Sequence, residues 1–477
     1  MILRRTQSLC PECLRRVEAS YVYSATDAHT VVLRKTCPDH GTFSVPVWRE
    51  SGEGAAATPP FASWSRPKNP SYPVNPRTPI RDGCPYDCGL CPAHAQHTCT
   101  GLFEVTKRCD MACPVCYAQA GSVSNPLRSE ADDISLDVIA MQMDVLKGAS
   151  GPCNVQISGG EPTVRDDLPQ IIGLARQRGF GLVQVNTNGL RLARQQGYAR
   201  SLRDAGLDSV YLQWDGVRES SFMALRSREC LEFKRRAVSN CADAGLGVVL
   251  VATVVRGVND GELGDLLRLA LDMGPAVRGL HIQPAAFFGR YPWQLEEAPR
   301  LTLPDVMAAL ARQAPELVSP SHLHPPGCEN ELCSFSAVYR RVQHNGKPGL
   351  QWLSDAGQSC CSPAPQTVGA SVPPPAEEGA RKAKQFVAMH WKGDDTAGES
   401  RVSPNSGADG FSRFLAHAGA EQRFTLSSMA FQDALSLDLD RVRGCCIHVV
   451  RPDGRMIPFC LHNLTASNGT RLYGEQP

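Results

Sequence analysis

Seven cysteines between residues 84 and 116 fall into two groups of different size. Four thiolates are enough to close a zinc site or a [4Fe–4S] cluster, whereas three leave one metal position without a protein ligand. Because catalytic metal sites keep such an open position, the smaller group is the candidate for chemistry. The larger group is Cys84, Cys88, Cys91 and Cys99, and the smaller group is Cys109, Cys113 and Cys116.

The bulk composition narrows the kind of protein that carries these cysteines. The 49 lysines and arginines nearly balance the 48 aspartates and glutamates, which argues against a nucleic-acid partner. The first residues, MILRRTQSLCPEC, lack the long apolar core of a secretion signal. The longest apolar run, 246–255, is about half of the roughly 20 residues that a transmembrane helix needs. We therefore expect a cytoplasmic protein whose twenty cysteines are reduced thiols, and short fixed spacings between such thiols indicate metal sites.

Residues 1–50 are predicted to form a small module with a metal site of its own. The motifs CPEC and CPDH lie at the two ends of a segment that alternates apolar and polar residues like a β-hairpin. Two such turns, each with two ligands, resemble a zinc ribbon or a rubredoxin-like site. Zinc and mononuclear iron both accept tetrahedral thiolate-rich sites, so the spacing leaves both metals open. The four ligands would be Cys10, Cys13, Cys37 and His40.

Two segments are predicted to lack a packed structure. Residues 51–80 have a proline every few positions, which favours extended chain and opposes helix, so this segment is expected to be a linker. Residues from about 363 to 410 are rich in proline, glycine, alanine and serine, and are expected to be a disordered insertion.

Between these segments, strand-like and helix-like stretches alternate, which predicts the α/β class with a parallel sheet. A helix is expected to begin at Ser135 and to bury Ile139, Met143 and Leu146, and another ends at Gly179. In parallel sheets, functional residues collect at the carboxyl ends of the strands, where the cysteine groups would lie. The expected strands are 101–106, 153–158, 181–187, 209–215, 247–255 and 279–285.

The stretch CDMACPVCY, from Cys109 to Tyr117, follows directly on the first expected strand. It resembles the signature of the radical S-adenosylmethionine (SAM) enzymes. In that family three cysteines hold a [4Fe–4S] cluster, SAM chelates the open iron, and reductive cleavage releases a 5′-deoxyadenosyl radical. The resemblance implies a partial (β/α)6 barrel over residues 101–315, and a reductant such as ferredoxin or flavodoxin as partner.

Further expected contacts to SAM follow the strand ends. Gly159, Gly160, Glu161 and Pro162, in ISGGEPTVRDDL, match the pattern with which the family holds the amino group of SAM. The alternative is an ordinary strand-ending turn. Asn188 in NTNG and Gln213 in QWDG are weaker candidates, because either motif can simply cap the following helix. The family resemblance also assigns Tyr117 to the cofactor.

The remaining cysteines suggest auxiliary centres. Segment 81–100 holds the four-cysteine group, which fits a closed [4Fe–4S] cluster, with zinc as the alternative. Residues 316–477 are predicted to form a C-terminal cluster-binding extension, in which a hairpin with PDG as its turn brings further cysteines together. Paired cysteines are also common as buried apolar residues. The cysteines interpreted as core or loop thiols are Cys153, Cys230, Cys241, Cys360 and Cys361. The candidate ligands of the extension are Cys328, Cys333, Cys445, Cys446 and Cys460.

The order of these parts along the chain resembles one branch of the family. That branch is the tetraether lipid synthase group of radical SAM proteins, together with its relative, the methanogen enzyme that methylates a pterin precursor. The resemblance implies one or two auxiliary [4Fe–4S] clusters and mononuclear iron or zinc in the N-terminal module. It also implies carbon–carbon coupling of lipid alkyl chains, hence lipid biosynthesis with peripheral membrane access.

Other functions remain open at this point. The same initiation chemistry could instead methylate a pterin-like or other small heterocycle. Two non-catalytic hypotheses are an iron–sulfur electron carrier and a zinc-scaffolded binding module. The three-cysteine loop followed by GGEP argues against both, since a carrier would close every cluster with four ligands.

Overall fold

The N-terminal module is a four-stranded antiparallel sheet. The computed structural model describes residues 1–51, 57–121, 130, 133–151, 153–344, 346–353, 373–393 and 423–474. The strands of the module pair in chain order, and the turn after the first strand and the turn after the third carry the CPEC and CPDH motifs. The prediction of a small cysteine-rich module is confirmed. Its strands are β1 Ile2–Leu9, β2 Arg16–Tyr23, β3 Thr30–Cys37 and β4 Gly41–Arg49.

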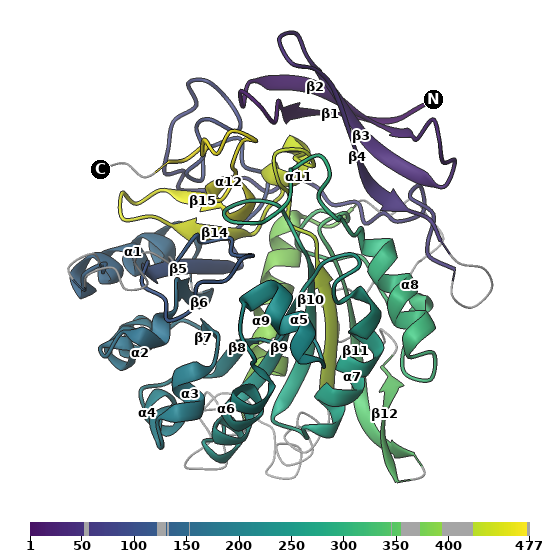
Figure 1. The fold of residues 1–477 in the computed structure, drawn as a ribbon. Coiled ribbons are helices and arrows are strands. Elements are labelled where there is room, and N and C mark those ends of the chain that lie inside the picture. The colour runs from purple at the N-terminus through teal and green to yellow at the C-terminus, as the bar shows by residue number, and fades with distance from the viewer. Residues whose placement is uncertain are drawn as a thin grey trace.

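A second sheet of eleven strands forms the body of the molecule (Figure 1). Six consecutive parallel strands make its centre, which confirms the predicted α/β class with a parallel sheet. Each of them alternates side chains between its two faces. They are β5 Thr100–Thr106, β6 Asn154–Gly159, β7 Leu182–Thr187, β8 Ser209–Gln213, β9 Gly247–Val254 and β10 Val277–Pro284.

C-terminal strands extend both edges of this sheet. At one edge, β13 runs parallel to β10 and pairs on its other side with β11 of the antiparallel hairpin β11–β12. At the other edge, β14 runs parallel to β5 and pairs antiparallel with β15. The PDG turn predicted between two strands connects β14 and β15. The added strands are β11 Ser334–His344, β12 Lys347–Trp352, β13 Arg423–Met429, β14 Ile447–Val450 and β15 Met456–Pro458.

Helices cover the outside of the central strands (Figure 1). The first begins after Ser135, whose hydroxyl caps it, and buries Ile139, Met143 and Leu146, as predicted. None of the described helices is both long and apolar enough to cross a bilayer. The helices are α1 Leu136–Ser150, α2 Leu168–Gln177, α3 Leu190–Arg194, α4 Tyr198–Asp204, α5 Glu219–Arg226, α6 Leu231–Asp243, α7 Leu263–Asp272, α8 Leu303–Gln313, α9 Ala376–Trp391, α11 Leu439–Arg443 and α12 Phe459–His462.

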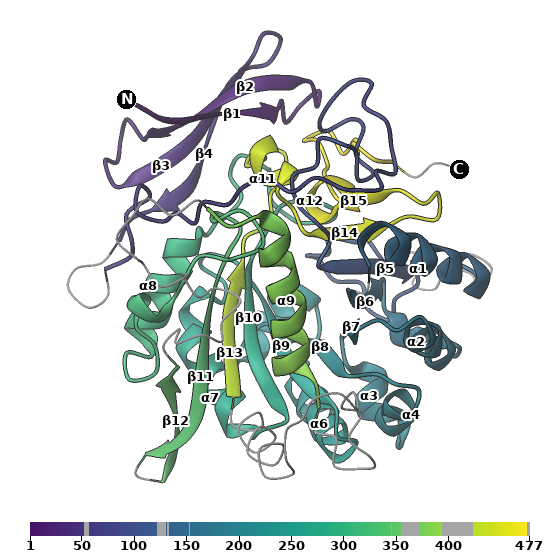
Figure 2. The ribbon, with the colours of Figure 1, turned by 180° about the vertical axis from the view of Figure 1, so that it is seen from behind.

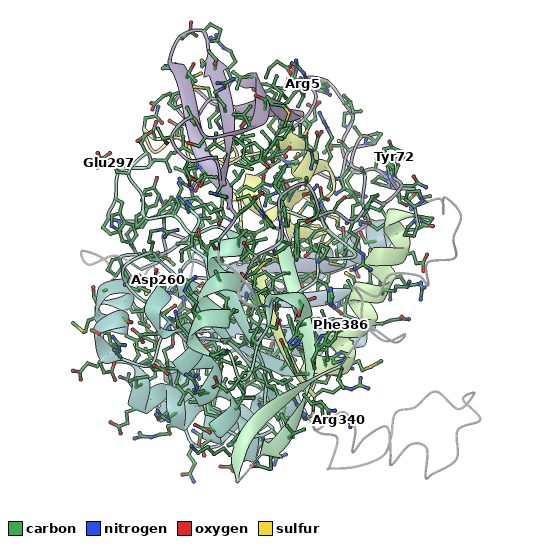
Figure 3. The ribbon with its side chains drawn as sticks, turned by 90° about the vertical axis from the view of Figure 1, so that its right-hand side faces the viewer. Arg5, Tyr72, Asp260, Glu297, Arg340 and Phe386 are labelled. Carbon is green, nitrogen blue, oxygen red and sulfur yellow. The ribbon has the colours of Figure 1, made fainter. Side chains whose placement is uncertain are left out.

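Helix α9 corrects the expectation for residues 363–410. Residues 373–393 of that range include a helix of 16 residues, whereas 363–372 and 394–410 lie outside the described residues. α9 packs against β6, β9, β10 and β13 (Figure 2). Its Phe386 is buried, whereas Tyr72 is exposed; both are labelled in Figure 3. The helix was missed because its buried positions include small alanines and because proline- and glycine-rich sequence surrounds it.

The segment predicted to be a linker is anchored to the body over its described part. The indole of Trp64 donates to the Glu331 carbonyl at 2.7 Å. Asn69 exchanges backbone hydrogen bonds with the residues that precede and begin α9, accepting from Ala376 at 2.8 Å. The extended chain therefore connects the N-terminal module to α9 and to the loop around Glu331.

Candidate active site

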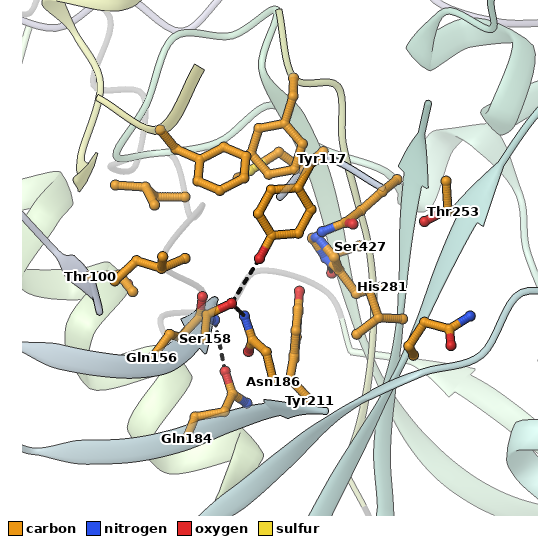
Figure 4. Close-up of a pocket in the computed structure, with 18 of the residues that line it drawn as sticks. Thr100, Tyr117, Gln156, Ser158, Gln184, Asn186, Tyr211, Thr253, His281 and Ser427 are labelled. Carbon is orange, nitrogen blue, oxygen red and sulfur yellow. Dashed lines mark hydrogen bonds between the residues drawn. The ribbon is translucent and has the colours of Figure 1, made fainter. Parts of the chain in front are cut away.

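A cavity of about 370 Å³ lies inside the curved sheet. The loop that carries Cys109, Cys113 and Cys116 lines one part of it, and residues of α9 line another. Between them, side chains at alternate positions of the strands face the cavity (Figure 4). The structure therefore brings the predicted cluster loop together with the predicted SAM motif, because Gly159, Gly160 and Glu161 line the same cavity.

The loop between β5 and α1 carries the three cysteines and is clamped by Arg290. The Arg290 guanidinium donates to the carbonyls of Cys113 at 2.7 Å, Gly121 at 2.7 Å and Ala120 at 2.8 Å. Its backbone exchanges two hydrogen bonds of 2.9 Å with Cys116. Sequence reasoning missed this residue, because Arg290 lies far from the motif in the chain and follows no recognised pattern.

Tyr117 points from the cluster loop toward the strands. Its hydroxyl lies 2.8 Å from the Ser158 hydroxyl, which also accepts from the Asn186 side chain at 3.3 Å (Figure 4). The amide oxygen of Asn186 is buried and has no partner among the described residues. A buried acceptor without a partner is costly unless a ligand supplies a donor, so this wall of the cavity is suited to a bound polar molecule.

The two glycines of the GGEP motif allow β6 to approach the cluster loop closely. Gly159 has a φ of +120°, and a Cβ placed there would lie 2.4 Å from the Thr106 carbonyl oxygen. A Cβ on Gly160 would lie 2.1 Å from the Arg108 carbonyl oxygen. Neither contact is sterically possible, so the motif needs glycine at both positions for the loop and the strand end to meet.

Comparison with known proteins agrees with this geometry. The model of the radical SAM superfamily matches residues 103–270, and the model of an HMPTM N-terminal zinc ribbon domain matches residues 2–49. A 7,8-dihydro-6-hydroxymethylpterin dimethyltransferase of Methanocaldococcus jannaschii is 31% identical over 96% of this chain and 93% of its own length. The chain belongs to the radical SAM superfamily.

Other known proteins match a smaller part of this chain. A probable GTP 3′,8-cyclase of Methanothermobacter thermautotrophicus is 28% identical over 39% of this chain and 58% of its own. An Fe-coproporphyrin III synthase of Methanosarcina barkeri is 32% identical over 32% of this chain and 36% of its own. Among solved structures, Streptococcus suis SuiB bound to S-adenosylmethionine matches at 12% identity, with 39% of each chain covered and a TM-score of 0.32.

Membership in the radical SAM superfamily implies SAM and a [4Fe–4S] cluster. The residues present fit both groups. Three cysteine thiols on one loop line the cavity and leave a fourth metal position open, and the unpartnered oxygen of Asn186 lies on the wall beside Tyr117.

Glu161 is held by the protein in this radical SAM site. Its Oε1 accepts from the Thr163 amide at 3.0 Å and from the hydroxyls of Thr163 at 2.6 Å and Thr187 at 2.7 Å. Its Oε2 accepts from the Asn188 amide at 2.7 Å. Burial, together with the nearby charge of Asp110, raises the pKa of Glu161 to about 6. The carboxylate therefore ties the end of β6 to the end of β7.

The two weaker SAM candidates are also held by neighbouring residues. The side chain of Asn188 donates to Asp110 at 2.7 Å and accepts from the Leu190 amide at 2.8 Å. The second contact is a local turn directly before α3, whose N-cap is Gly189 and has no side-chain cap. Gln213 donates to Asp215 and accepts from Lys234 at 3.0 Å, and burial lowers the pKa of that lysine to about 8.

A buried ion pair behind the cluster loop was not predicted from the sequence. Arg226, on α5, makes two hydrogen bonds to Asp215, of 2.7 and 2.8 Å. The same guanidinium donates to the Val115 carbonyl at 2.7 Å, within the cysteine loop. Arg226 lines the cavity, so it places a positive charge close to the three thiols while Asp215 balances it. The sequence analysis had singled out the QWDG motif, which contains Asp215, but only for its Gln213.

The four predicted ligands of the N-terminal module lie together. Cys10 and Cys37 sulfurs lie 3.6 and 3.5 Å from Nδ1 of His40, and the Cys13 and Cys37 sulfurs are 4.0 Å apart. All four donor atoms lie within 4.8 Å of one another. These separations suit one tetrahedral metal ion, and the matching family model is that of a zinc ribbon.

Cys99 corrects the predicted grouping of the auxiliary cysteines. Its sulfur lies within 4.8 Å of those of Cys328 and Cys446, rather than completing the set with Cys84, Cys88 and Cys91. The reason is that β14 pairs with β5, so the residues just before these strands are neighbours, and the Cys99 amide donates to the Cys446 carbonyl at 2.9 Å. This pairing joins residues more than 300 positions apart, so the spacing of cysteines along the sequence could not predict it.

The other predicted ligands of the extension are not part of the group formed by Cys99, Cys328 and Cys446. Burial raises the pKa of the Cys445 thiol, and so do the nearby Cys460, Cys333 and Cys99. Arg441 donates to the Cys333 sulfur at 3.4 Å. Of the predicted ligands of the extension, Cys328 and Cys446 therefore lie with Cys99, whereas Cys333, Cys445 and Cys460 lie outside that group. Cys153, Cys230 and Cys241 are buried, and Cys360 and Cys361 lie outside the described residues.

Proposed function

We propose that this radical SAM enzyme methylates a pterin-like heterocycle. The observation that carries the proposal is a group of uncharged polar side chains on one wall of a largely apolar cavity, at alternate positions of consecutive strands. The name of the Methanocaldococcus jannaschii relative, which matches almost the whole chain, supports the same substrate class. When bound, the cluster and SAM supply the radical that takes hydrogen from an unactivated carbon.

Amide side chains make up the part of the polar wall on β6 and β7. The Gln156 side chain donates to that of Gln184 at 2.8 Å, and Gln184 donates in turn to the Ser209 hydroxyl at 2.9 Å. With Asn186 beside them, these groups offer donors and acceptors to a ligand that has several ring nitrogens and oxygens. A pterin has such a set of edge groups.

Aromatic rings lie next to the amides. The Tyr211 ring lies 5.5 Å from that of His281 and 5.7 Å from that of Trp391, measured between centroids. Burial lowers the pKa of His281 to about 3, so its imidazole is neutral at physiological pH and accepts or donates without bringing a charge. Planar rings of this kind suit a planar ligand that stacks on them.

The polar wall favours a heterocycle over a lipid chain. An alkyl chain placed there would give no donor to the buried Asn186 amide oxygen, which has no partner among the described residues, and an acceptor left unpaired in this way costs about 1–3 kcal/mol. The lipid-coupling hypothesis from the sequence is therefore less well supported, both by this wall and by the relative named as a pterin dimethyltransferase.

We assign the metal and SAM contacts within the same proposal. Cys109, Cys113 and Cys116 hold the catalytic cluster, and Tyr117, Gly159, Gly160 and Pro162 contact SAM. Glu161, Asn188 and Gln213 act as positioning residues, since neighbouring side chains and backbone groups hold them. Ferredoxin or flavodoxin would deliver the electrons. Auxiliary metal centres would lie at Cys84, Cys88 and Cys91, at Cys99, Cys328 and Cys446, and at Cys333, Cys445 and Cys460.

The proposal is tested on the full chain after anaerobic reconstitution with iron and sulfide. Incubation with dithionite, 7,8-dihydro-6-hydroxymethylpterin and excess SAM, of which one molecule is cleaved and another donates the methyl group, should give 5′-deoxyadenosine and a methylated pterin, both measured by mass spectrometry. Cys113→Ala should abolish both products, because it removes a cluster ligand. Gln184→Leu should raise the KM for the pterin by about 5–150-fold, as expected for a lost hydrogen bond of roughly 1–3 kcal/mol, and should keep SAM cleavage.

Two results would contradict this assignment. Absence of 5′-deoxyadenosine under all conditions would remove the radical initiation that both substrate hypotheses share. Cleavage of SAM without pterin methylation, together with cross-linked chains when a dialkyl glycerol lipid is supplied, would favour lipid coupling instead.

A further inference from the structure

Three buried cysteines from distant parts of the chain form a site at the edge of the cavity. Cys99 precedes β5, Cys446 precedes β14, and Cys328 lies in the loop that leads to β11. Their side chains are 7%, 1% and 2% exposed, and their sulfurs lie within 4.8 Å of one another. Three thiolates supply three ligands to a centre that takes four, whether it is a single metal ion or an iron–sulfur cluster.

Glu329, the residue after Cys328, is the next donor beside these thiols. Its Oε2 lies 3.8 Å from the Cys446 sulfur, while its Oε1 accepts from the Ser334 hydroxyl at 2.5 Å. Carboxylate oxygens bind such metals at about 2.1 Å and thiolates at about 2.3 Å, so two ligands of one tetrahedral metal lie roughly 3.5 Å apart. The observed separation is close to that value.

The backbone around Glu329 is fixed so that its side chain faces the thiols. Lys68, in the extended segment, donates to the carbonyls of Cys328 and Glu329. The buried side chain of Gln96 donates to the Cys328 carbonyl at 2.5 Å. Helix α9 closes the other side, since a Cβ on Gly379 would lie 2.0 Å from the Gly327 carbonyl oxygen. These contacts hold the loop in place from three segments of the chain.

We propose that Glu329 is the fourth protein ligand of the metal centre held by Cys99, Cys328 and Cys446. The inference rests on the proposed metal occupancy of these cysteines. Among the described residues, the three sulfurs have no fourth donor within 4.8 Å of all of them, and the Glu329 carboxylate lies 3.8 Å from one of the three, the sulfur of Cys446. All four residues line the same cavity as Cys109, Cys113 and Cys116, so the carboxylate ligand faces the space in which the substrate is bound.

The test uses the full chain with Cys109, Cys113 and Cys116 replaced by alanine, so that the catalytic cluster is removed. Further replacement of Cys99, Cys328 and Cys446 by alanine defines the share of iron or zinc that this centre binds. Glu329→Gln keeps the shape but removes the charge and should lose at least half of that share, or shift the electron paramagnetic resonance spectrum of the reduced protein. Glu329→Cys should restore the metal content with a shifted spectrum, because a thiolate replaces the carboxylate.

Glu331→Gln is the matched control, since its carboxylate pairs with Arg4 at 2.9 Å and should leave metal and spectrum unchanged. The melting temperature shows whether the Glu329→Gln variant is folded. The proposal is overturned if the folded variant keeps all of the metal that this centre binds, and if its electron paramagnetic resonance spectrum equals that of the protein with Glu329, both with and without added 2-mercaptoethanol. It is also overturned if the triple cysteine replacement loses no metal. Neither result affects SAM cleavage or pterin methylation, which are measured separately on the chain with an intact catalytic cluster.

Discussion

Arg290 shows how one side chain can set the position of a catalytic loop. Its guanidinium is shared among three carbonyls of the loop that holds Cys113, and its own backbone pairs with Cys116. The preceding residue, Gly289, has a φ of +74°, and a Cβ there would lie 2.4 Å from the Tyr117 carbonyl oxygen. The chain after β10 thus packs directly on the cysteine loop and fixes where its thiols point.

Replacement of Arg290 should therefore impair the catalytic cluster more than the fold. Arg290→Ala leaves three carbonyls without their charged donor, at about 1.5–3 kcal/mol for each bond to a charged group. We expect less than half of the wild-type 5′-deoxyadenosine rate and a matching loss of reconstituted catalytic iron. Arg290→Lys should restore only part of both, because a lysine lacks the planar fork.

Arg256→Ala is the control for this prediction, because Arg256 lies on the surface and pairs with Asp305 at 2.8 Å. It should reconstitute like the wild type. Equal iron content and equal SAM cleavage in Arg290→Ala and Arg256→Ala would mean that the loop holds its shape without the clamp.

At the scale of elements, α9 belongs to the cavity. Ala383, Phe386, Val387 and Trp391 line it, and the Trp391 indole donates to the Thr425 hydroxyl of β13 at 3.0 Å. Phe386 is 8% exposed, whereas Met389 on the same helix is 58% exposed. Replacing Phe386 therefore tests the face of α9 that lines the cavity, and replacing Met389 tests the exposed face of the same helix.

Phe386→Ala should destabilise the protein by about 3–5 kcal/mol if the site does not collapse, and should raise the KM for the pterin substrate. Met389→Ala should change stability by no more than roughly 0.5 kcal/mol and leave the KM unchanged. Unfolding curves and steady-state methylation measure the two effects. If the KM of Phe386→Ala equals that of the wild type, α9 closes the cavity without touching the substrate.

The elements also show what the sequence could predict. Apolar spacing located α1 and the six central strands, since local periodicity is enough to indicate them, and the spacing of Cys109, Cys113 and Cys116 located the catalytic loop. Arg290, Arg226 and the partnership of Cys99 with Cys446 were missed because each depends on pairing between distant segments. Helix α9 was missed because composition over a long window concealed a short amphipathic stretch.

At the scale of the whole molecule, buried polar groups join the N-terminal module to the body. Asp438 is fully buried and accepts from the hydroxyls of Thr6, at 2.6 Å, and Tyr21. Lys35, on β3, donates to the Ala434 carbonyl at 2.6 Å. The same stretch continues to Asp433, which pairs with Arg300 and accepts from the Phe287 amide at 3.0 Å, close to the Arg290 clamp.

This arrangement makes Asp438 the residue on which docking of the module depends. Asp438→Ala leaves the hydroxyls of Thr6 and Tyr21 and the Asp440 amide without their acceptor in a buried interface, at a cost of about 3 kcal/mol or more. The melting temperature should fall by several degrees, and limited proteolysis should cut faster within residues 51–80. Asp440→Asn is the matched change, because Asp440 is partly exposed and pairs with Arg443 at 2.8 Å, and it should behave like the wild type. Asp433 contacts the segment that precedes Arg290, so Asp438→Ala should also lower the iron content of the catalytic cluster. Unchanged iron with a lower melting temperature would show that the module stabilises the body without influencing the catalytic loop.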